Sequence, residues 1–376
     1  MQLDHLWLTD FRNYATADLA FPAGLLAITG ANGAGKTNLL EAIAYLAVLS
    51  SFRGVGNEAL VRREMAQAVV RGQGQRAGRQ LLIEAEIQAN GRGRTTVNRQ
   101  PLRRGSDLAD ALRVTVFSPD DLELVKAGPT GRRRYLDDTL ASLHPRHDAA
   151  RRDFERVLRQ RNALLAQMGG RVTDETATTL AVWDTRLVET GEAVGRARAD
   201  LVQRLEQAVA KAYTQLAGGG DIRLSYDAPW LADGLAAALS RHRRDELRRS
   251  VSLVGPHRDE LTLTIAGMPA RTHASQGEQR SLALALRLGS HGLVTEQVGD
   301  PPLLLLDDVF SELDPARSAF LVEHLPAGQA VLTTTGHLPA GVVPEQVVRV
   351  TQGRLDRASG GQSHQSRVDL EQAPPP

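Results

Sequence analysis

A glycine-rich stretch near the start of the chain has the residue types and the spacing of a phosphate-binding loop. The sequence GANGAGKTN, residues 30–38, follows the apolar run 25–28. Its glycines allow consecutive backbone N–H groups to converge on phosphate oxygens, while lysine suits the terminal phosphates and threonine suits Mg²⁺. The pattern predicts a nucleotide site with bound Mg²⁺. Its predicted members are Gly30, Ala31, Asn32, Gly33, Ala34, Gly35, Lys36, Thr37 and Asn38, with Lys36 also assigned a catalytic role.

Two adjacent aspartates supply the acidic side of this predicted site. The sequence LLLLDD, residues 303–308, has four apolar residues typical of a buried parallel strand, and the carboxylates come at its end. Asp307 is placed to hold the hydration shell of Mg²⁺ together with Thr37. Asp308 points toward the attacking water and is the candidate general base.

A second stretch can bind phosphate through the start of a helix. In ASQGEQRSLALALRL, residues 274–288, Ser275, Gln276 and Gly277 open a helix with free N–H groups. One nucleotide does not need two phosphate-binding segments from the same chain. We therefore expect Ser275 and Gly277 to act in trans, each subunit completing the γ-phosphate site of its partner in a homodimer.

The elements that position these motifs follow an interrupted α/β pattern. Strands lead into the glycine loop, a helix begins at about Thr37, and short strands at about 66–100 predict an antiparallel meander. The apolar stripe of Phe154, Val157, Leu158, Leu164 and Leu165 predicts helix packing within a lobe. The predicted fold is an α/β nucleotide-binding head formed by 1–130 and 250–357, an inserted helical lobe at 131–249, and a flexible tail at 358–376.

Composition excludes several classes of protein. The 376 residues include no cysteine, which excludes a disulfide framework and a cysteine nucleophile. The formal net charge is +1, so contact with nucleic acid requires local basic patches. The start of the chain does not resemble a signal peptide, and no run has the apolar length of a membrane span. A cytoplasmic protein without a membrane partner is expected.

The order of the motifs resembles the ABC ATPase family. A phosphate loop, an inserted region, an S-x-G-x-Q signature and a carboxylate strand are followed by SELD at residues 311–314. The resemblance implies that Ser311 and Asp314 lie near the partner subunit. Asp308 stands where the family usually has glutamate, which fits a slow switch. The usual switch histidine is displaced or missing, and Thr335 and His337 both stay open as candidates for the γ-phosphate contact.

Within the ABC ATPases, the chain is similar to the RecF family of bacterial DNA replication and repair proteins, an SMC-like branch. The similarity implies ATP binding, an ATP-dependent homodimer, weak DNA-stimulated ATP hydrolysis, DNA binding, cooperation with RecO and RecR in directing RecA to gapped DNA, and a part in the SOS response. Arg12 and Asn13 fall in a segment that lies near the nucleotide in similar heads. Residues 118–121 lie where the wider ABC family has its metal-contacting glutamine loop, but they include no glutamine. The stretches that carry the resemblance are LTDFRNY (8–14), GANGAGKTNLLEAI (30–43), SFRG (51–54), FSPDDLELV (117–125), GPTGRRRYLD (128–137), RQRNALL (159–165), GPHRDEL (255–261), SQGEQR and LLLDDVFSELD.

Two arginine-rich segments are the candidates for DNA contact. Residues 132–161 hold nine arginines against five acids, and 241–249 hold five against two. Arginine suits phosphate oxygens, and the lack of interleaved aromatic residues favours backbone contacts on duplex or junction DNA. Solvated helix faces whose arginines pair with neighbouring acids are the alternative for either cluster. The candidates are Arg132, Arg133, Arg134, Arg151, Arg152, Arg243 and Arg244.

Two other functions share part of this pattern. The nucleotide-binding subunit of an ABC transporter would have the same loop, signature and carboxylates, but the large insertion and the stretches similar to RecF count against it. An SMC-like scaffold head that clamps DNA with ATP bound, and for which hydrolysis only resets the clamp, differs from the preferred function in degree.

Overall fold

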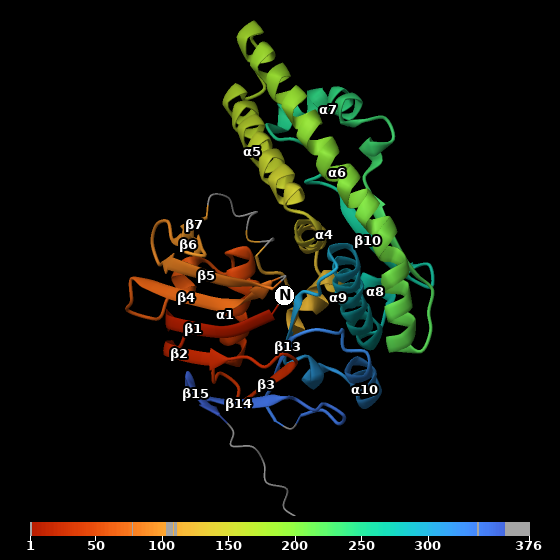
Figure 1. Cartoon of the computed structure of the whole chain (residues 1–376). Helices are drawn as coiled ribbons and strands as arrows, with labels where there is room; N and C mark the ends of the chain where they lie inside the picture. Colours follow the sequence, from red (N-terminus) through yellow and green to blue (C-terminus); the bar gives the residue numbers. More distant parts are fainter. Residues whose placement is uncertain (1, 77, 103–107, 109–110, 337, 358–376) are drawn as a thin grey trace, which may run out of the picture.

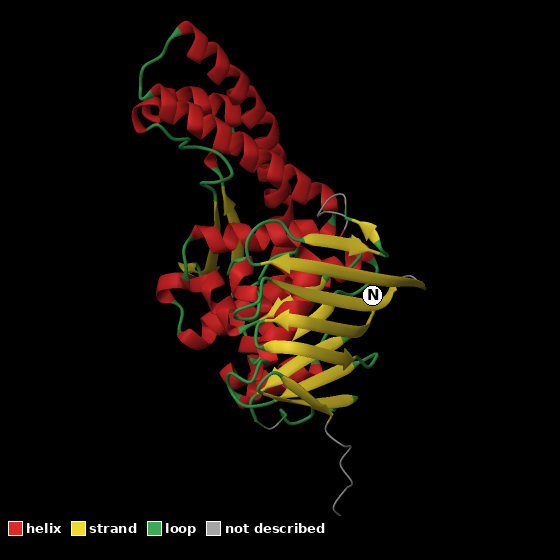
Figure 2. Cartoon of the chain, turned by 90° about the vertical axis from the view of Figure 1, so that its left-hand side faces the viewer, coloured by secondary structure: helices red, strands yellow, loops and turns green. Residues whose placement is uncertain are grey.

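The computed structural model describes residues 2–76, 78–102, 108, 111–336 and 338–357. The chain forms a head that contains two six-stranded sheets, and a helical lobe projects from it (Figures 1 and 2). The predicted tail, residues 358–376, and the switch candidate His337 lie outside the described residues.

A mostly parallel sheet brings the predicted motifs to one edge. Its strand order is β15-β14-β3-β13-β12-β8, and only the β14–β15 pair among these is antiparallel. The register places Asp307 beside Thr333 and Thr334 beside Thr29. The carboxyl ends of three strands therefore meet next to the glycine loop, as in other open α/β sheets that bind ligands. The strands are β3 Leu25–Thr29, β8 Val114–Phe117, β12 Leu303–Asp307, β13 Ala330–Thr334, β14 Gln346–Thr351 and β15 Arg354–Arg357.

Strand β12 is covered on both faces, as its continuous apolar run predicts. All five of its residues are buried. Leu303 and Leu305 belong to the core that contains α1, Lys36–Val48. Leu304 and Leu306 point the other way, into the core that contains α9, Gln276–Val298. The helices that follow the two phosphate-binding segments thus contribute to the cores on opposite faces of this strand.

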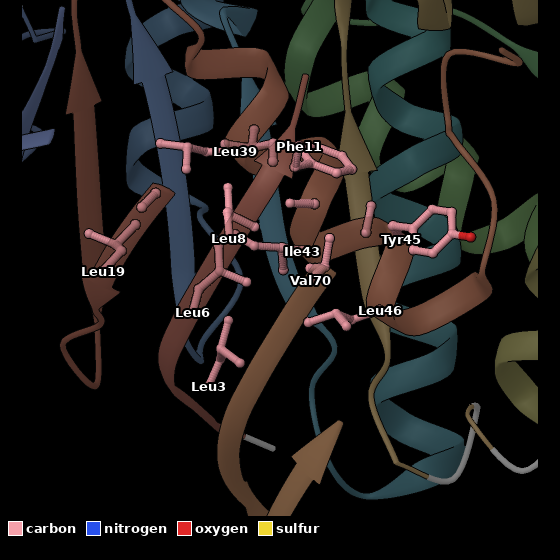
Figure 3. Close-up of a cluster of buried hydrophobic side chains, with 14 of the residues drawn as sticks. Leu3, Leu6, Leu8, Phe11, Leu19, Leu39, Ile43, Tyr45, Leu46 and Val70 are labelled. Carbon is pink, nitrogen blue, oxygen red and sulfur yellow. The ribbon is translucent and has the colours of Figure 1, made fainter. Parts of the chain in front are cut away.

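An antiparallel sheet covers the other side of α1. Its order is β2-β1-β4-β5-β6-β7; the strands of residues 67–101 pair in sequence order, and the opening hairpin extends the same sheet. Leu6 and Leu8 of β1 point toward Ile43 and Leu46 of α1 (Figure 3). The strands are β1 Gln2–Phe11, β2 Tyr14–Ala20, β4 Gln67–Arg76, β5 Arg79–Gln88, β6 Arg94–Val97 and β7 Gln100–Pro101.

The helical lobe is organised along one helix, α6, Asp174–Ala217, whose 44 residues extend about 66 Å. One part of α6 packs with α5 and α7 in the projecting lobe, and the other part packs against α9 in the head (Figure 1). Phe154 and Val157 are buried in the lobe core, and Leu165 is buried in a smaller cluster, which confirms the packing role of the predicted stripe. The other helices here are α4 Pro129–Leu143, α5 Pro145–Met168 and α7 Leu235–Arg249.

A small sheet joins the inserted region to the head. Strand β9, Ile222–Asp227, lies within the predicted lobe and pairs with β10, Glu260–Ile265, which belongs to the predicted head segment. This pairing joins residues on the two sides of the predicted boundary at 249. The division of the chain at 131 and 249 therefore stays a prediction. The remaining elements are α2 Asn57–Leu60, η2 Pro119–Leu122, α3 Glu123–Lys126, η3 Pro229–Leu231, β11 Met268–Pro269, α8 Ala270–His273, η4 Val309–Glu312 and α10 Pro315–Glu323.

Among the helices of the described residues, none is both long enough and apolar enough to cross a membrane.

Candidate nucleotide site

The glycine loop lies between β3 and α1 and has the backbone conformation that its glycines permit. Gly35 has φ 120° and Gly30 has φ 156°. A Cβ at Gly30 would lie 2.4 Å from the carbonyl oxygen of Val350, so a side chain does not fit there. The N-terminus of α1 has no side-chain cap, which leaves its first N–H groups available for an anion.

Lys36 is folded over the loop. Its Nζ donates to the carbonyl oxygens of Gly30, at 2.7 Å, and Ala31, at 3.0 Å. Burial lowers the pKa of Lys36, and the carboxylates of Asp308 and Asp307 oppose that shift. Phosphate oxygens are stronger acceptors than carbonyl oxygens, so a nucleotide can replace the two carbonyls as partners of this ammonium.

Asp307 and Thr37 meet although they are far apart in the sequence. The Thr37 hydroxyl donates to Asp307 Oδ1 at 2.9 Å, and the Thr333 hydroxyl donates to the same oxygen at 2.8 Å. Burial raises the pKa of Asp307, and these two hydrogen bonds oppose the rise. Mg²⁺ prefers oxygen ligands and keeps several waters, so the Thr37 and Asp307 oxygens fit its requirements beside a phosphate.

Asp308 adopts an unusual backbone conformation that its neighbours maintain. Its φ is 48°, in the left-handed region that aspartate tolerates better than most residues. Its N–H donates to Thr333 Oγ1 at 2.9 Å, and its carbonyl oxygen accepts from Ser311 Oγ at 2.7 Å. Ser311 therefore contacts the carboxylate segment within its own chain. Thr333 was missed by sequence reasoning, which considered only residues beyond the end of β13.

The β1–β2 hairpin supports the glycine loop through hydrogen bonds. Asn13 Nδ2 donates to the Ala34 carbonyl at 2.9 Å, and Asn38 Nδ2 donates to Asn13 Oδ1 at 2.8 Å. Tyr14 donates its hydroxyl to the Gly35 carbonyl at 3.0 Å, and burial raises the pKa of this hydroxyl. Asn13 is thus next to the glycine loop.

Arg12 has a different set of partners. Its guanidinium binds Glu41 of α1 through two hydrogen bonds of 2.7 Å and also donates to the Ala59 carbonyl. Glu41 is fully buried and accepts from Ser51 as well. Arg53, in the following turn, is exposed, and its charge lowers the pKa of Asp307 against the dominant effect of burial. Arg53 is a second residue that sequence reasoning missed, although it lies in the quoted SFRG.

The signature residues form a well-capped and accessible helix start. Ser275 Oγ accepts from the Glu278 N–H at 3.3 Å, and Glu278 accepts from the Ser275 N–H at 2.7 Å. Ser275 and Gln276 are exposed, and Gly277 is half-buried. Asp314 caps α10 by accepting from the Arg317 N–H at 2.9 Å.

The other switch and loop candidates lie at the ends of elements. Thr335 directly follows β13 and is exposed. At the position of the glutamine loop, the Asp121 carboxylate accepts from the Ser118 N–H at 3.0 Å and from Arg287 of α9. This loop is therefore joined to the helix that begins with the signature.

Several of the predicted DNA-contacting arginines are engaged within the protein. Arg132 is buried and binds Glu260, and Arg133 donates to the Asp259 carbonyl. Buried Arg132 and half-buried Arg133 thus connect α4 with β10 and with the residue before it. Arg151 and Arg152 share Asp148, and Arg134 pairs with Asp138 at 3.6 Å.

The candidates on α7 are more accessible. Arg243 pairs with Asp184, whereas Arg244 is exposed. Arg241, Arg244 and Arg248 line an open hollow at the distal end of the lobe and have the spacing of one helix face.

The fold and the site together define an ABC-type ATPase head. The family model described as RecF/RecN/SMC N terminal domain matches residues 2–352. DNA replication and repair protein RecF from Kineococcus radiotolerans is 42% identical over 94% of this chain and 96% of its own length. RecF from Streptomyces avermitilis is 41% identical over 95% of this chain and all of its own length. The chain belongs to the RecF family.

Solved structures agree with this assignment. The structure of the recombination mediator protein RecF-ATP in the RecFOR pathway has a TM-score of 0.88 and 28% identity, covering 95% of this chain and 98% of that one. An Smc head domain from Pyrococcus furiosus has a TM-score of 0.56 and 16% identity, with 95% and 96% of the two chains covered, and supports the fold alone.

Proposed function

We propose that this protein is an ATP-dependent DNA-binding protein of recombinational repair and replication. Each chain binds one ATP with Mg²⁺, and two chains close into a homodimer around both nucleotides. The observation that carries the proposal is the meeting of Lys36, Thr37 and Asp307 at the glycine loop. Membership of the RecF family, whose named relatives are DNA replication and repair proteins, supports the cellular role.

Hydrolysis in this proposal is slow and serves as a switch. Lys36 neutralises the terminal phosphates, Thr37 and Asp307 hold Mg²⁺, and Asp308 accepts the proton of the attacking water. The carboxylate of Asp308 is one methylene shorter than that of the glutamate usual in ABC ATPases. Its position depends on the strained backbone held by Thr333 and Ser311. Thr335 and His337 stay open as contacts to the γ-phosphate.

The second half of each nucleotide site comes from the partner. Ser275 and Gly277 bind the γ-phosphate of the ATP held by the other chain, and Ser311 and Asp314 lie at the same interface. The exposure of Ser275 and Gln276 supports this arrangement, because an accessible helix start can receive an anion from another molecule.

DNA contact is assigned to the accessible face of α7. We assign phosphate contacts to Arg241, Arg244 and Arg248. Arg241 and Arg248 form exposed ion pairs, which contribute little to stability and can be exchanged for contacts with phosphate. Bound to duplex or gapped DNA, the dimer would cooperate with RecR and RecO in loading RecA and in the SOS response. The similar ATP-bound structure is that of a RecF recombination mediator in the RecFOR pathway, which supports these partners.

The decisive experiment measures the affinity for a fluorescent DNA duplex with Mg-ATP, with Mg-ADP and without nucleotide, each at two salt concentrations. The proposal expects tight binding only with Mg-ATP. It also expects log affinity to fall with log salt by about 0.9 for each phosphate contacted. Binding that ignores the nucleotide would contradict ATP gating.

Variants separate the DNA contact from the nucleotide site. Arg244→Ala should weaken DNA binding and reduce the salt slope by about one contact, with ATP binding unchanged. Arg63→Ala is the matched control, because the Arg63 side chain is 95% exposed and lies in the head. If both variants bind DNA as the wild type does, the assignment to α7 is wrong.

A further inference from the structure

Arg317, in the first turn of α10, connects two segments that are separate in the sequence. Its guanidinium binds the carboxylate of Asp314, and its Nε donates to Ser281 Oγ of α9 at 2.8 Å. The Ser281 hydroxyl in turn donates to the Gly277 carbonyl at 3.0 Å. One side chain thus joins the SELD segment to the signature turn.

The same guanidinium lies close to the backbone of residue 277. A Cβ on Gly277 would lie 3.3 Å from Arg317 Nη2 and 3.5 Å from Nη1. The arginine side chain therefore lies next to the first turn of α9. Its side chain is 24% exposed, so the positive charge reaches the surface beside Ser275.

The charge of Arg317 also affects the pKa values of two nearby acids, Glu278 and Asp314. Hydrogen bonds from Ser275 are the first cause of the lowered pKa of Glu278, and the charge of Arg317 adds to them. The pKa of Asp314 is lowered first by its hydrogen bond from the Arg317 N–H and then by the Arg317 charge. Both shifts favour the ionised carboxylate, and Asp314 pairs directly with the Arg317 guanidinium.

We propose that Arg317 is a positioning residue for the nucleotide bound by the partner subunit. It holds Asp314 and the signature turn as one surface and presents a positive charge beside the place where the partner's γ-phosphate arrives. This inference rests on the proposed ATP-dependent dimer. It goes further by assigning a cation to each composite site in trans, in addition to Lys36 in cis.

A role limited to capping α10 does not account for these contacts. The cap of α10 is the bond from the Arg317 backbone N–H to Asp314, at 2.9 Å, and every residue except proline can donate it. Arg317→Ala keeps that bond and removes the side-chain links to Ser281 and to the Asp314 carboxylate together with the charge. The variant therefore tests the side chain without removing the cap of the helix.

The first test compares wild type, Arg317→Ala and Arg317→Lys, with Arg63→Ala as the control. Sedimentation measures the dimer with Mg-ATP, and a fluorescent ATP analogue measures binding to the dilute monomer. Arg317→Ala should weaken the dimer about tenfold, which is the low end of the range for losing the contact of a charged group, here with the nucleotide of the partner. ATP binding to the monomer and the melting temperature should stay near wild type.

Each result of this comparison bears on the inference. Lysine keeps the charge but lacks the fork that reaches Ser281 and Asp314 together, so Arg317→Lys should recover only part of the lost affinity. Wild-type dimerisation of Arg317→Ala would overturn the inference. Full recovery with Arg317→Lys would overturn the bridging role.

A mixing experiment decides between action in cis and in trans. Lys36→Ala and Arg317→Ala are each assayed for ATP hydrolysis alone and then mixed. If Arg317 acts in trans, the mixed dimer has one site with an intact Lys36 from one chain and an intact Arg317 from the other, and activity returns. If it acts in cis, neither site is intact and no activity returns, which overturns the inference.

A control mixture separates this inference from the proposed function. Lys36→Ala mixed with Ser275→Arg tests the signature itself by the same logic. Recovery in this control but not with Arg317→Ala would reject only the role of Arg317. Failure of the control would reject the composite site in trans, and the inference with it.

Discussion

Thr333 connects the two aspartates of the site, and removing its hydroxyl tests the geometry proposed for hydrolysis. The residue is 1% exposed, donates to Asp307 Oδ1 and accepts from the Asp308 N–H. Thr333→Val has nearly the same shape but leaves that N–H without its acceptor. The cost of an unsatisfied buried group predicts a free energy of unfolding lower by about 2 kcal/mol. Misplaced carboxylates that stabilise the transition state by about 1.4 kcal/mol less would lower kcat tenfold.

The pH dependence should change in a defined direction. The hydrogen bond from Thr333 opposes the raised pKa of Asp307, so its loss raises this pKa further. A carboxyl group binds Mg²⁺ only when it is ionised. The Mg²⁺ requirement of Thr333→Val should therefore increase, most strongly as the pH is lowered.

The assay is steady-state ATP hydrolysis with Mg²⁺ titrated at several pH values, beside nucleotide binding measured without Mg²⁺. Thr333→Ser is the control, because it keeps the hydroxyl and loses only a methyl group. It should retain most of the wild-type kcat. A folded Thr333→Val protein with wild-type kcat and Mg²⁺ dependence would refute the reasoning. An equal loss in Thr333→Ser would attribute the effect to packing of the methyl group.

Three further variants test other parts of the structure. Lys36→Ala should abolish measurable ATP binding in calorimetry while leaving the melting temperature nearly unchanged, and retained affinity would contradict its assignment. Asp308→Asn should bind ATP and form the dimer but stall before hydrolysis, so the sedimenting dimer should persist; normal turnover would exclude Asp308 as the base. Burial lowers the pKa of His291 to about 4 from 6.5. Its contribution to stability, up to about 3 kcal/mol, is therefore present above pH 6.5 and lost as the pH falls through 4. Denaturant unfolding of His291→Leu should show a smaller loss over that range, and an unchanged pH slope would contradict this source.

The sequence was sufficient for features that depend on neighbouring residues. The glycine loop and the signature turn each combine within a few positions the residues needed for a helix N-terminus, so α1 and α9 begin within one residue of where they were expected. The apolar run 303–306 likewise indicated a strand buried on both faces. Such patterns are local, and their interpretation did not require the rest of the fold.

Features that depend on strand register or long-range pairing could not be predicted. Thr333 meets Asp307 because β12 and β13 are aligned in parallel at that residue. Arg132 lies in an arginine-rich stretch that suggests DNA contact, yet its partner Glu260 is 128 residues away. Charge counted along the sequence does not distinguish an arginine that is buried in such a pair from one that is exposed.

The contacts of the site divide into two sets, and this division bears on how ATP acts. Residues from both ends of the chain, Asn13 and Gly353, fix the glycine loop through the Ala34 carbonyl. Arg317 separately ties the signature turn to Asp314. Asp308 lies between the two sets, since Thr333 holds its N–H and Ser311 holds its carbonyl oxygen. A nucleotide that contacts the glycine loop of one chain and the signature turn of another therefore acts on two surfaces that are each already ordered. In the proposed dimer the nucleotide joins these surfaces through ionic contacts, so raised salt should weaken closure.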